Sequence, residues 1–443
     1  MNEMPAQPAS KSPLNPLIAH AFAAPKLLNV ERAYEIMDKY GLSGIVASIP
    51  HNIYYLSSHS GIMQWMGRHF SSYAFFPRDE NAAPALIAQG TMLYHFDYRP
   101  TWIENIKAIS GPALSADGQP LIGSEGEPLA RPEPGIWPVR AGAEMSRGDK
   151  IQLALFDKFR GKTVVSALQG LKQALSEAGV ADKAIGFDDP RVGAWLQDIG
   201  LSSLQPIDAC NIFKEIRLVK TPREIELLRA AAQTGEAALL HAISQITPGQ
   251  PLADIEHNFS VEWAKRGGTA KWLIANVNGV NSGTIETGDW MKLDSVGTLA
   301  GYHGDIGRTV VLGPPPEELA RRIEADTKIS RIVYDSIRPG MRYIEAFKMF
   351  GELMKDEGFN IAFAGPHDVG LEHTDHPIET GGKNVPASIP YTELVFHEGT
   401  VFTLDMPHNE IGWGTVHVED MLVVRKTGCE LLSSGDTSLK QVG

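Results

Sequence analysis

Residues 293–313, LDSVGTLAGYHGDIGRTVVLG, hold two aspartates in a stretch rich in apolar and small residues. Alternation over 290–296 predicts a strand around Asp294, and the glycines and tyrosine before Asp305 predict a hairpin. Either both carboxylates are ordinary surface charges at a turn, or they meet across adjacent strands and hold a metal ion. A carboxylate on the core-facing side of a strand is costly unless it is paired or metal-bound, so its partners decide the function.

Composition excludes several classes of protein. The formal net charge is −13 with no run of lysine or arginine to offset it, so we expect no nucleic-acid partner. No apolar run approaches the roughly 18 residues of a membrane-spanning helix, so we expect no membrane association. Cys210 and Cys429 fit neither a zinc motif nor a disulfide framework, which favours free thiols in a reducing, cytoplasmic compartment.

A chain of 443 residues is too long for one ordinary core, and its character changes near residue 210. We expect a flexible arm over 1–29, an α/β domain over 30–210 and a second domain over 211–443. In the first domain, NVERAYEIMDKYGLSG (29–44) and SALQGLKQALSEAGV (166–180) read as helices, and SGIVASIP (43–50) and AIGFDD (184–189) hold strands. The segment NIYYLSSHSG (52–61) reads as a further strand with its turn. The Gly- and Pro-rich segment 111–142 is a lid, an intersubunit arm or a surface loop.

The second domain begins with a long helical stretch in which Thr221 is a candidate N-cap and Pro222 the first helical residue. Further helices are predicted near 252–267, 318–337 and 342–359. The last strands are predicted in GTVFTLDMP and GTVHVEDMLVV. In the second of these, alternation puts His417 and Glu419 on one face and Val416 and Val418 on the other.

Five residues in elements with apolar or small neighbours stand out as candidate metal ligands. Taken singly, each is more often a salt-bridged or surface residue; their order and spacing together point to a metal centre. They are Asp294, Asp305, His367, Asp405 and Glu419.

With these residues, the chain resembles the creatinase/aminopeptidase P/prolidase group, the M24 or pita-bread metallopeptidases. The resemblance rests on GDWMKLDSVGTLAGYHGDIGRT with its eleven-residue step between acids, on GPHDVGLEH, and on the two last strands. RAYEIMDKYGLSGIVASIPHNIYYLSS and EIRLVKTPREIELLRAAA extend it over nearly the whole chain. It implies an α+β fold, with a creatinase-like α/β amino-terminal domain followed by a pita-bread catalytic domain.

The resemblance also implies a site for two divalent metal ions. Asp294 would bind one ion, Asp305 and Glu419 would bridge both, and His367 and Asp405 would complete the other. Four carboxylates and one imidazole suit Mn²⁺, Fe²⁺, Co²⁺ or Zn²⁺. In the family, the residue at the Asp405 position also shuttles a proton, and the proteins form homodimers or higher oligomers.

Several positions depart from the peptidase pattern. Glu286 and Thr374 stand where the family peptidases carry substrate-binding histidines, Asp405 replaces a usual glutamate, and His417 replaces a frequent arginine. We expect other groups near the site to substitute for the missing histidines, and take Glu286, His373 and Asp375 as catalytic candidates beside Asp405. The candidate substrate-binding residues are Glu286, His373, His376 and His417. Glu379, His303 and Arg308 are further candidates near the site. A simpler interpretation is that His303 faces solvent and that Arg308 pairs with a core acid.

These features predict a dinuclear metal-dependent hydrolase that cleaves an amide-type C–N bond in a small substrate by metal-bound hydroxide. An Xaa-Pro aminopeptidase or dipeptidase of the prolidase type is the first alternative. A lyase acting on a small charged substrate, with Asp375 as base, is the second. A non-catalytic module that binds a protein partner is the third, and the five intact ligand positions argue against it.

Overall fold

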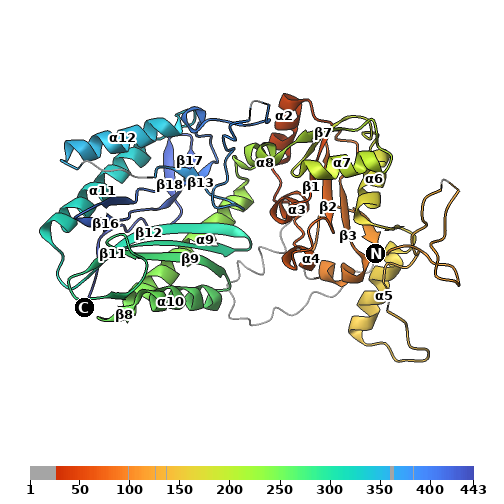
Figure 1. Ribbon diagram of the computed structural model, residues 1–443, viewed down its shortest axis with the longest axis horizontal. Helices are drawn as coiled ribbons and strands as arrows, with labels where there is room; N and C mark the ends of the chain where they lie inside the picture. Colours follow the sequence, from red (N-terminus) through yellow and green to blue (C-terminus); the bar gives the residue numbers. More distant parts are fainter. Residues whose placement is uncertain (1–25, 98, 125, 136, 360–363, 383) are drawn as a thin grey trace. The chain divides into compact units, whose positions relative to one another are not determined.

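The computed structural model of the chain describes residues 26–443, apart from Tyr98, Glu125, Ile136, 360–363 and Lys383. The described residues form two units (Figure 1). The amino-terminal unit comprises the described part of Phe22–Arg223 together with Asp375–Leu394; the carboxy-terminal unit comprises Glu224–Thr374 and Val395–Gly443. The arm predicted over 1–29 lies outside the described residues as far as residue 25, and Asn29 caps the first described helix.

A seven-stranded sheet forms the centre of the amino-terminal unit, in the order β5-β4-β3-β2-β1-β6-β7. Short apolar runs make its inner strands buried along most of their length, as expected for strands covered on both faces. Strand β1 pairs antiparallel with β2 and parallel with β6. The strands are β1 Gly44–Ala47, β2 Tyr73–Pro77, β3 Ala85–Gln89, β4 Asn105–Ile109, β5 Thr163–Val164, β6 Ala184–Phe187 and β7 Gln205–Asp208.

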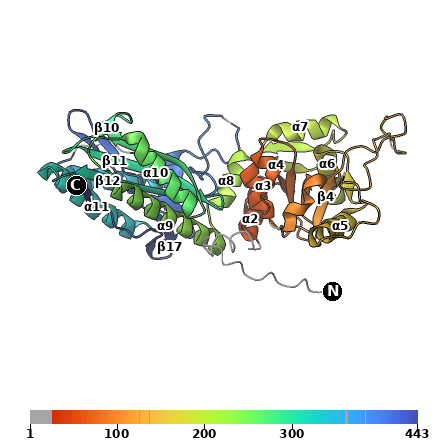
Figure 2. The same cartoon turned by 90° about the horizontal axis from the view of Figure 1, so that it is seen from below.

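Helices α6 and α7 cover one face of this sheet through a shared apolar cluster that includes Leu171, Leu196 and Phe75 (Figures 1 and 2). Helix α6 begins with Ser166 as N-cap and is followed by Gly179 in the left-handed region. The helices of the unit are α2 Val30–Tyr40, α3 Pro50–Ser57, α4 Ile62–Trp65, η1 Gly90–Asp97, α5 Arg147–Phe159, α6 Ala167–Glu177, α7 Pro190–Asp198, α8 Cys210–Arg217 and η2 Tyr391–Glu393.

The strand predicted at 52–61 is wrong, because this segment forms helix α3. Pro50 occupies its first turn, where a missing N–H costs nothing. The carboxylate of Asp188, at the end of β6, accepts hydrogen bonds from the backbone N–H groups of Ser48 at 2.8 Å and Ile49 at 2.9 Å, and from the Asn52 side chain at 3.0 Å. This long-range partner satisfies polar groups at the start of the helix and overrides the β-propensity of Ile53, Tyr54 and Tyr55.

Beyond α3, the side chain of His59 predicts a pH dependence of stability. Burial lowers the pKa of His59 to about 4, below its ordinary 6.5, and the nearby charges of His95 and Arg99 act in the same direction. Between about pH 6.5 and 4, His59 is therefore protonated in the unfolded chain and neutral in the folded protein. Stability from this residue is complete above about pH 6.5 and falls by about 3 kcal/mol as the pH drops towards 4.

The His59→Asn variant tests this effect. Nδ1–H of His59 donates to the Arg99 carbonyl at 2.6 Å, and an asparagine amide retains this donor without titrating. We expect the variant to lose less thermal stability than the wild type between pH 6.5 and 4.5, measured by the unfolding midpoint at each pH. Equal slopes in the two proteins would contradict the assignment.

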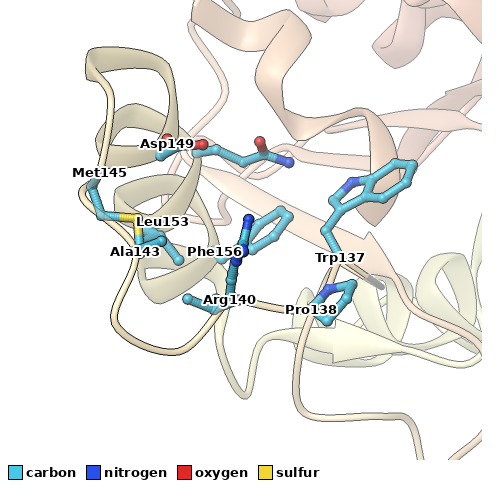
Figure 3. A pocket seen from close by; sticks show the side chains of 10 residues that line it. Trp137, Pro138, Arg140, Ala143, Met145, Asp149, Leu153 and Phe156 are labelled. Carbon is cyan, nitrogen blue, oxygen red and sulfur yellow. The ribbon is translucent and has the colours of Figure 1, made fainter.

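Within the described residues of segment 111–142, isolated bridges pair Pro112 with Ala130 and Ile122 with Pro128, so the segment folds back on itself. It leads into a pocket of about 210 Å³ against helix α5, where Trp137 and Phe156 face the cavity (Figure 3). Asp149 at its edge is engaged by the Ser146 backbone N–H at 2.9 Å and by its hydroxyl at 2.7 Å. The pocket therefore offers apolar contact area, with its carboxylate already committed to the helix cap.

The long hairpin β11–β12 is the main feature of the carboxy-terminal unit. It lies in the four-stranded sheet β19-β12-β11-β9, and a second four-stranded sheet has the order β13-β14-β17-β18. A Cβ on Gly304 would lie 2.3 Å from the Ala231 carbonyl oxygen, so glycine is needed for α9 to pack on the hairpin. The strands are β8 Gln250–Pro251, β9 Thr269–Val277, β10 Thr284–Ile285, β11 Trp290–Leu299, β12 Tyr302–Leu312, β13 His367–Asp368, β14 Val401–Thr403, β15 His408–Glu410, β16 Gly414–Val416, β17 Met421–Arg425, β18 Gly428–Leu431 and β19 Lys440–Val442.

Within the described residues, four helices complete this unit: α9 Pro222–Ser244, α10 Leu252–Lys265, α11 Glu317–Ser336 and α12 Tyr343–Asp356. Helix α9 begins at Pro222, as the sequence predicts, but the helical stretch is interrupted before it, since α8 ends at Arg217. Helix α8 belongs to the amino-terminal unit, because the units divide at Arg223, whereas the predicted boundary lies near 210. None of the helices within the described residues is long and apolar enough to cross a membrane.

Candidate metal centre

Asp294 and Asp305 project from the same face of the β11–β12 hairpin. In the antiparallel register, Asp294 lies opposite Gly307 and Asp305 lies opposite Val296. Because side chains on a strand alternate between faces, the two carboxylates are diagonal neighbours on one side of the sheet. Asp305 is buried and Asp294 is half-buried, so neither is an ordinary surface charge at a turn.

Residues from the second sheet are brought to the same face. His367 lies on β13, which pairs with β14, and Asp405 follows the end of β14. Glu419 joins the two sheets directly, since its backbone N–H and C=O each form a 3.2 Å hydrogen bond with Gly307. Strands far apart in the sequence therefore deliver their polar side chains to one place.

In the part of the chain that the structure describes, seven side chains form three overlapping groups, and within each group the potential ligand atoms lie within 4.8 Å of one another. The structure brings together the five predicted metal ligands and adds two histidines to them. The groups are Asp305, His367 and His373; Asp294, His417 and Glu419; and His367, Asp405 and Glu419.

The histidines make short contacts with the carboxylates. Nε2 of His373 lies 3.1 Å from Oδ2 of Asp305, and Nε2 of His367 lies 3.7 Å from the same oxygen. On the other side of the cluster, Nε2 of His417 lies 2.9 Å from Oδ1 of Asp405 and 3.4 Å from Oε2 of Glu419. Every carboxylate of the cluster except Asp294 is thus within 4 Å of an imidazole nitrogen.

The electrostatics of the cluster show a deficit of positive charge. Burial and neighbouring carboxylates, of which Asp305 has the largest effect, raise the pKa of Glu419 well above its ordinary value. Burial likewise raises the pKa of Asp294, although His417 opposes the shift. Burial would raise the pKa of Asp405 as well, but the hydrogen bond from His417 lowers it below its ordinary value. Buried like charges repel one another, so an added cation would stabilise the charged form of this set.

Unpaired polar atoms provide a test of whether this set of residues fits metal ions. Oδ1 of Asp305 and Oε2 of Glu419 are buried and have no hydrogen-bond partner among the described residues. Leaving a buried carboxylate oxygen unpaired is costly, whereas coordination of a divalent cation would satisfy it. Carboxylate oxygens with imidazole nitrogens are ligands that suit Mn²⁺, Fe²⁺, Co²⁺ and Zn²⁺. The residues present therefore fit the divalent ions implied by the resemblance.

The hydrogen-bond partners of Glu286 are residues outside this cluster. It is exposed in the turn between β10 and β11, its carboxylate accepts a hydrogen bond from Thr284 at 2.9 Å, and its backbone N–H donates to Asp289 at 2.9 Å. It belongs to none of the three groups of potential ligands. The structure therefore gives no support to the prediction that Glu286 is a catalytic and substrate-binding residue.

Asp375 belongs to the amino-terminal unit and is bound by two cations. Its carboxylate lies 2.7 Å from Nη2 of Arg217 and 3.0 Å from Nζ of Lys220, and all three side chains are at most 1% exposed. A carboxylate whose two oxygens are both held by buried cations is a poor base, which argues against its predicted catalytic role. His376 is buried in the same unit and Glu379 is exposed.

Two further candidates have structural contacts. Nδ1 of His303 is 3.0 Å from the Gly370 carbonyl, and the side chain is half-buried. Arg308 is buried and forms ion pairs with Glu236 at 2.7 Å and Asp420 at 2.9 Å. Arg308 thus pairs with core acids, the simpler of its two predicted roles.

Sequence reasoning missed the position that makes room for His417. A Cβ on Gly307 would lie 2.5 Å from Cε1 of the His417 ring, so the absence of a side chain allows the ring to sit beside the hairpin. The available signal was the sequence GDIGRT itself, in which Gly307 stands two residues after Asp305 and therefore on the same face of the strand.

Gly307→Ala is expected to push His417 out of the cluster and to weaken binding of a divalent cation by about 10- to 100-fold, the range seen for disturbed ligand environments. Titration calorimetry with Zn²⁺ measures the change. The control is Gly148→Ala, since a Cβ there meets only Ser146 Oγ at 3.8 Å. Unchanged affinity in Gly307→Ala would contradict the contact.

Comparison with known proteins agrees with this geometry. Residues 226–426 match the model of metallopeptidase family M24. The chain is 24% identical over 347 residues to an Xaa-Pro dipeptidase of Pyrococcus horikoshii, covering 76% of this chain and 92% of that protein. It is 26% identical over 241 residues to an Xaa-Pro dipeptidase of Pyrococcus furiosus, covering 52% of this chain and 67% of that protein.

Solved structures with the same fold include an Xaa-Pro dipeptidase from Bacillus anthracis, with a TM-score of 0.66 at 18% identity, covering 93% of this chain and 99% of that one. An X-Pro aminopeptidase from Thermotoga maritima has a TM-score of 0.63 at 16% identity, and the match covers 94% of this chain and 99% of that one. At these identities the likeness concerns the fold, and it confirms the predicted α+β, pita-bread architecture.

Proposed function

Residues 226–426 belong to metallopeptidase family M24, and on that premise we propose that the chain is a metal-dependent hydrolase cleaving an amide-type C–N bond in a small substrate. The observation that carries the proposal is the buried cluster of carboxylates and imidazoles with unpaired oxygens on Asp305 and Glu419. We infer two ion positions, held by Asp294, Asp305, His367, Asp405 and Glu419. Mn²⁺, Fe²⁺, Co²⁺ and Zn²⁺ all suit such ligands.

When bound, divalent ions lower the pKa of a coordinated water and polarise a carbonyl. The chain's own residues carry the proton and orient the substrate. Asp405 is the proton carrier, because its side chain is 18% exposed while those of Glu419 and Asp305 are 2% and 1% exposed. His417 holds Asp405 in place through the 2.9 Å contact. His373, 34% exposed in its side chain, faces the open edge of the cluster, where a substrate carbonyl would be oriented.

An Xaa-Pro dipeptide is the second candidate substrate, favoured by the names of the relatives. The first candidate, a small amide outside the peptide class, is favoured by Thr374, which offers a hydroxyl 3.3 Å from Nδ1 of His373 where the resembling peptidases carry a histidine. A lyase acting on a small charged substrate is the weakest candidate, because the proposed base Asp375 is neutralised by Arg217 and Lys220.

Hydrolysis of a panel of Xaa-Pro dipeptides and non-peptide amides by protein loaded with Mn²⁺ or Zn²⁺ tests the proposal. The expected result is turnover that disappears on chelation and returns with the metal. Fast cleavage of Xaa-Pro dipeptides would select the second candidate. Metal uptake without cleavage of either class would contradict the hydrolase proposal.

The proposed enzyme works in the cytoplasm as a homodimer or higher oligomer. The two cysteines, Cys210 and Cys429, are free thiols, which suits a reducing compartment. Sedimentation velocity measures the oligomeric state.

A further inference from the structure

His417 differs from the other two histidines of the cluster in its burial. Its side chain is 0% exposed, whereas those of His367 and His373 are 14% and 34% exposed. A buried imidazole among carboxylates can donate a hydrogen bond through a ring N–H or bind a cation through a bare ring nitrogen. The surroundings of the ring distinguish these roles.

The ring nitrogen Nε2 points into the cluster. It lies 2.9 Å from Oδ1 of Asp405 and 3.4 Å from Oε2 of Glu419. The residue also forms one of the groups of potential ligands, with Asp294 and Glu419. Oε2 of Glu419 has no hydrogen-bond partner among the described residues, so the contact with His417 does not satisfy it. A cation placed between Nε2 and this oxygen would satisfy both atoms at once.

The opposite ring nitrogen, Nδ1, can hold the ring proton and so leave Nε2 bare for an ion. Nδ1 of His417 is buried and has no hydrogen-bond partner among the described residues. Gly307 leaves the space in which the ring approaches the hairpin face that carries Asp294.

We propose that His417 is itself a metal ligand in the loaded protein: Nε2 exchanges its hydrogen bond to Asp405 for the ion shared by Asp294 and Glu419, and the ring proton then lies on Nδ1. This assignment rests on the proposed metal centre and adds a nitrogen ligand to it. An imidazole in place of an oxygen or guanidinium group shifts the ion position towards Zn²⁺, Co²⁺ and Fe²⁺ and away from Mn²⁺. The residue that the sequence analysis assigned to the substrate thus binds the ion.

The full-length protein loaded with Co²⁺ tests the assignment, because a ligating histidine gives a strongly shifted, exchangeable Nδ1–H resonance in the proton NMR spectrum. His417→Gln retains a donor for Asp405 but lacks the imidazole. We expect this variant to show one shifted exchangeable resonance fewer than the wild type. We also expect its affinity for Zn²⁺ at one position to fall by about 10- to 100-fold, and its affinity for Mn²⁺ to fall less.

His303→Gln is the matched control, since His303 lies on the same hairpin and contacts the Gly370 carbonyl outside the three ligand groups. It is expected to retain every shifted resonance. If His417→Gln also retains them all, with Zn²⁺ affinity unchanged, His417 only positions Asp405, and this inference fails while the proposed function stands. If the wild type itself takes up no divalent ion, both fail together.

Discussion

Replacing Glu419 with glutamine is expected to abolish binding of divalent ions and to lower hydrolytic activity by more than about 100-fold. The Thr403 hydroxyl donates to Oε1 of Glu419 at 2.6 Å, and the amide of glutamine retains this acceptor. What the variant loses is the unpaired, buried Oε2 of a residue that belongs to two of the three ligand groups. An amide N–H₂ in that place cannot coordinate a cation, so the loss exceeds that caused by disturbing an outer partner.

The same substitution is expected to stabilise the metal-free protein. Burial and the neighbouring carboxylates raise the pKa of Glu419, so the charged form is held at a cost in the absence of an ion. The unfolding midpoint of metal-free Glu419→Gln should exceed that of the metal-free wild type, while added Zn²⁺ should raise only the wild-type midpoint. Metal analysis and thermal unfolding with and without Zn²⁺ measure both effects.

Glu430→Gln supplies the control for this pair of effects. Glu430 lies on β18, in the sheet that carries β14 and β17, and its carboxylate is held by Arg229 and Arg425 outside the ligand groups. It should bind ions and turn over substrate as the wild type does. Full activity in Glu419→Gln would leave the cluster without a role in catalysis.

Asp375→Asn is expected to lower the free energy of unfolding by about 3–5 kcal/mol, the cost of removing one partner from a buried ion pair. Both oxygens of Asp375 are used: Oδ1 accepts from Nη2 and Nε of Arg217 at 2.7 and 2.9 Å, and Oδ2 accepts from Nζ of Lys220 at 3.0 Å. The amide would remove the negative charge that these two buried cations share. Urea denaturation followed by tryptophan fluorescence measures the change.

The exposed ion pair between Asp38 and Arg78, at 2.6 Å in the same unit, provides the comparison. Asp38→Asn should leave stability nearly unchanged, because solvent screens exposed pairs. Metal content of Asp375→Asn should equal that of the wild type. A variant that remains stable and loaded with metal yet inactive would restore Asp375 as a catalytic base and overturn its structural assignment.

Local sequence patterns predicted the parts of the site that depend on neighbouring residues. The hairpin between Asp294 and Asp305 follows from strand alternation and intervening glycines, and the shared face of His417 and Glu419 follows from the period of two. These rules state which side chains share a face of one strand. The same rules do not predict which side chains from other strands or helices contact that face.

Contacts between distant residues were beyond these patterns. The start of helix α3 depends on Asp188, which lies 140 residues after its hydrogen-bond partner Ser48. Asp375 is held by Arg217, which lies 158 residues earlier in the chain. The ion pairs of Arg308 with Glu236 and Asp420 are of the same kind. A residue's chemistry suggests that a partner exists, but only the packing of the unit selects it, which is why Asp375 was assigned to catalysis.

Diffraction from crystals of the wild-type protein soaked in Zn²⁺ or Mn²⁺, recorded at the absorption edge of the metal, tests the central claim most directly. We predict two anomalous peaks within coordination distance of the side chains of Asp294, Asp305, His367, Asp405 and Glu419. Anomalous density absent from this cluster, or found only at surface residues outside it, would contradict the assignment of a metal centre.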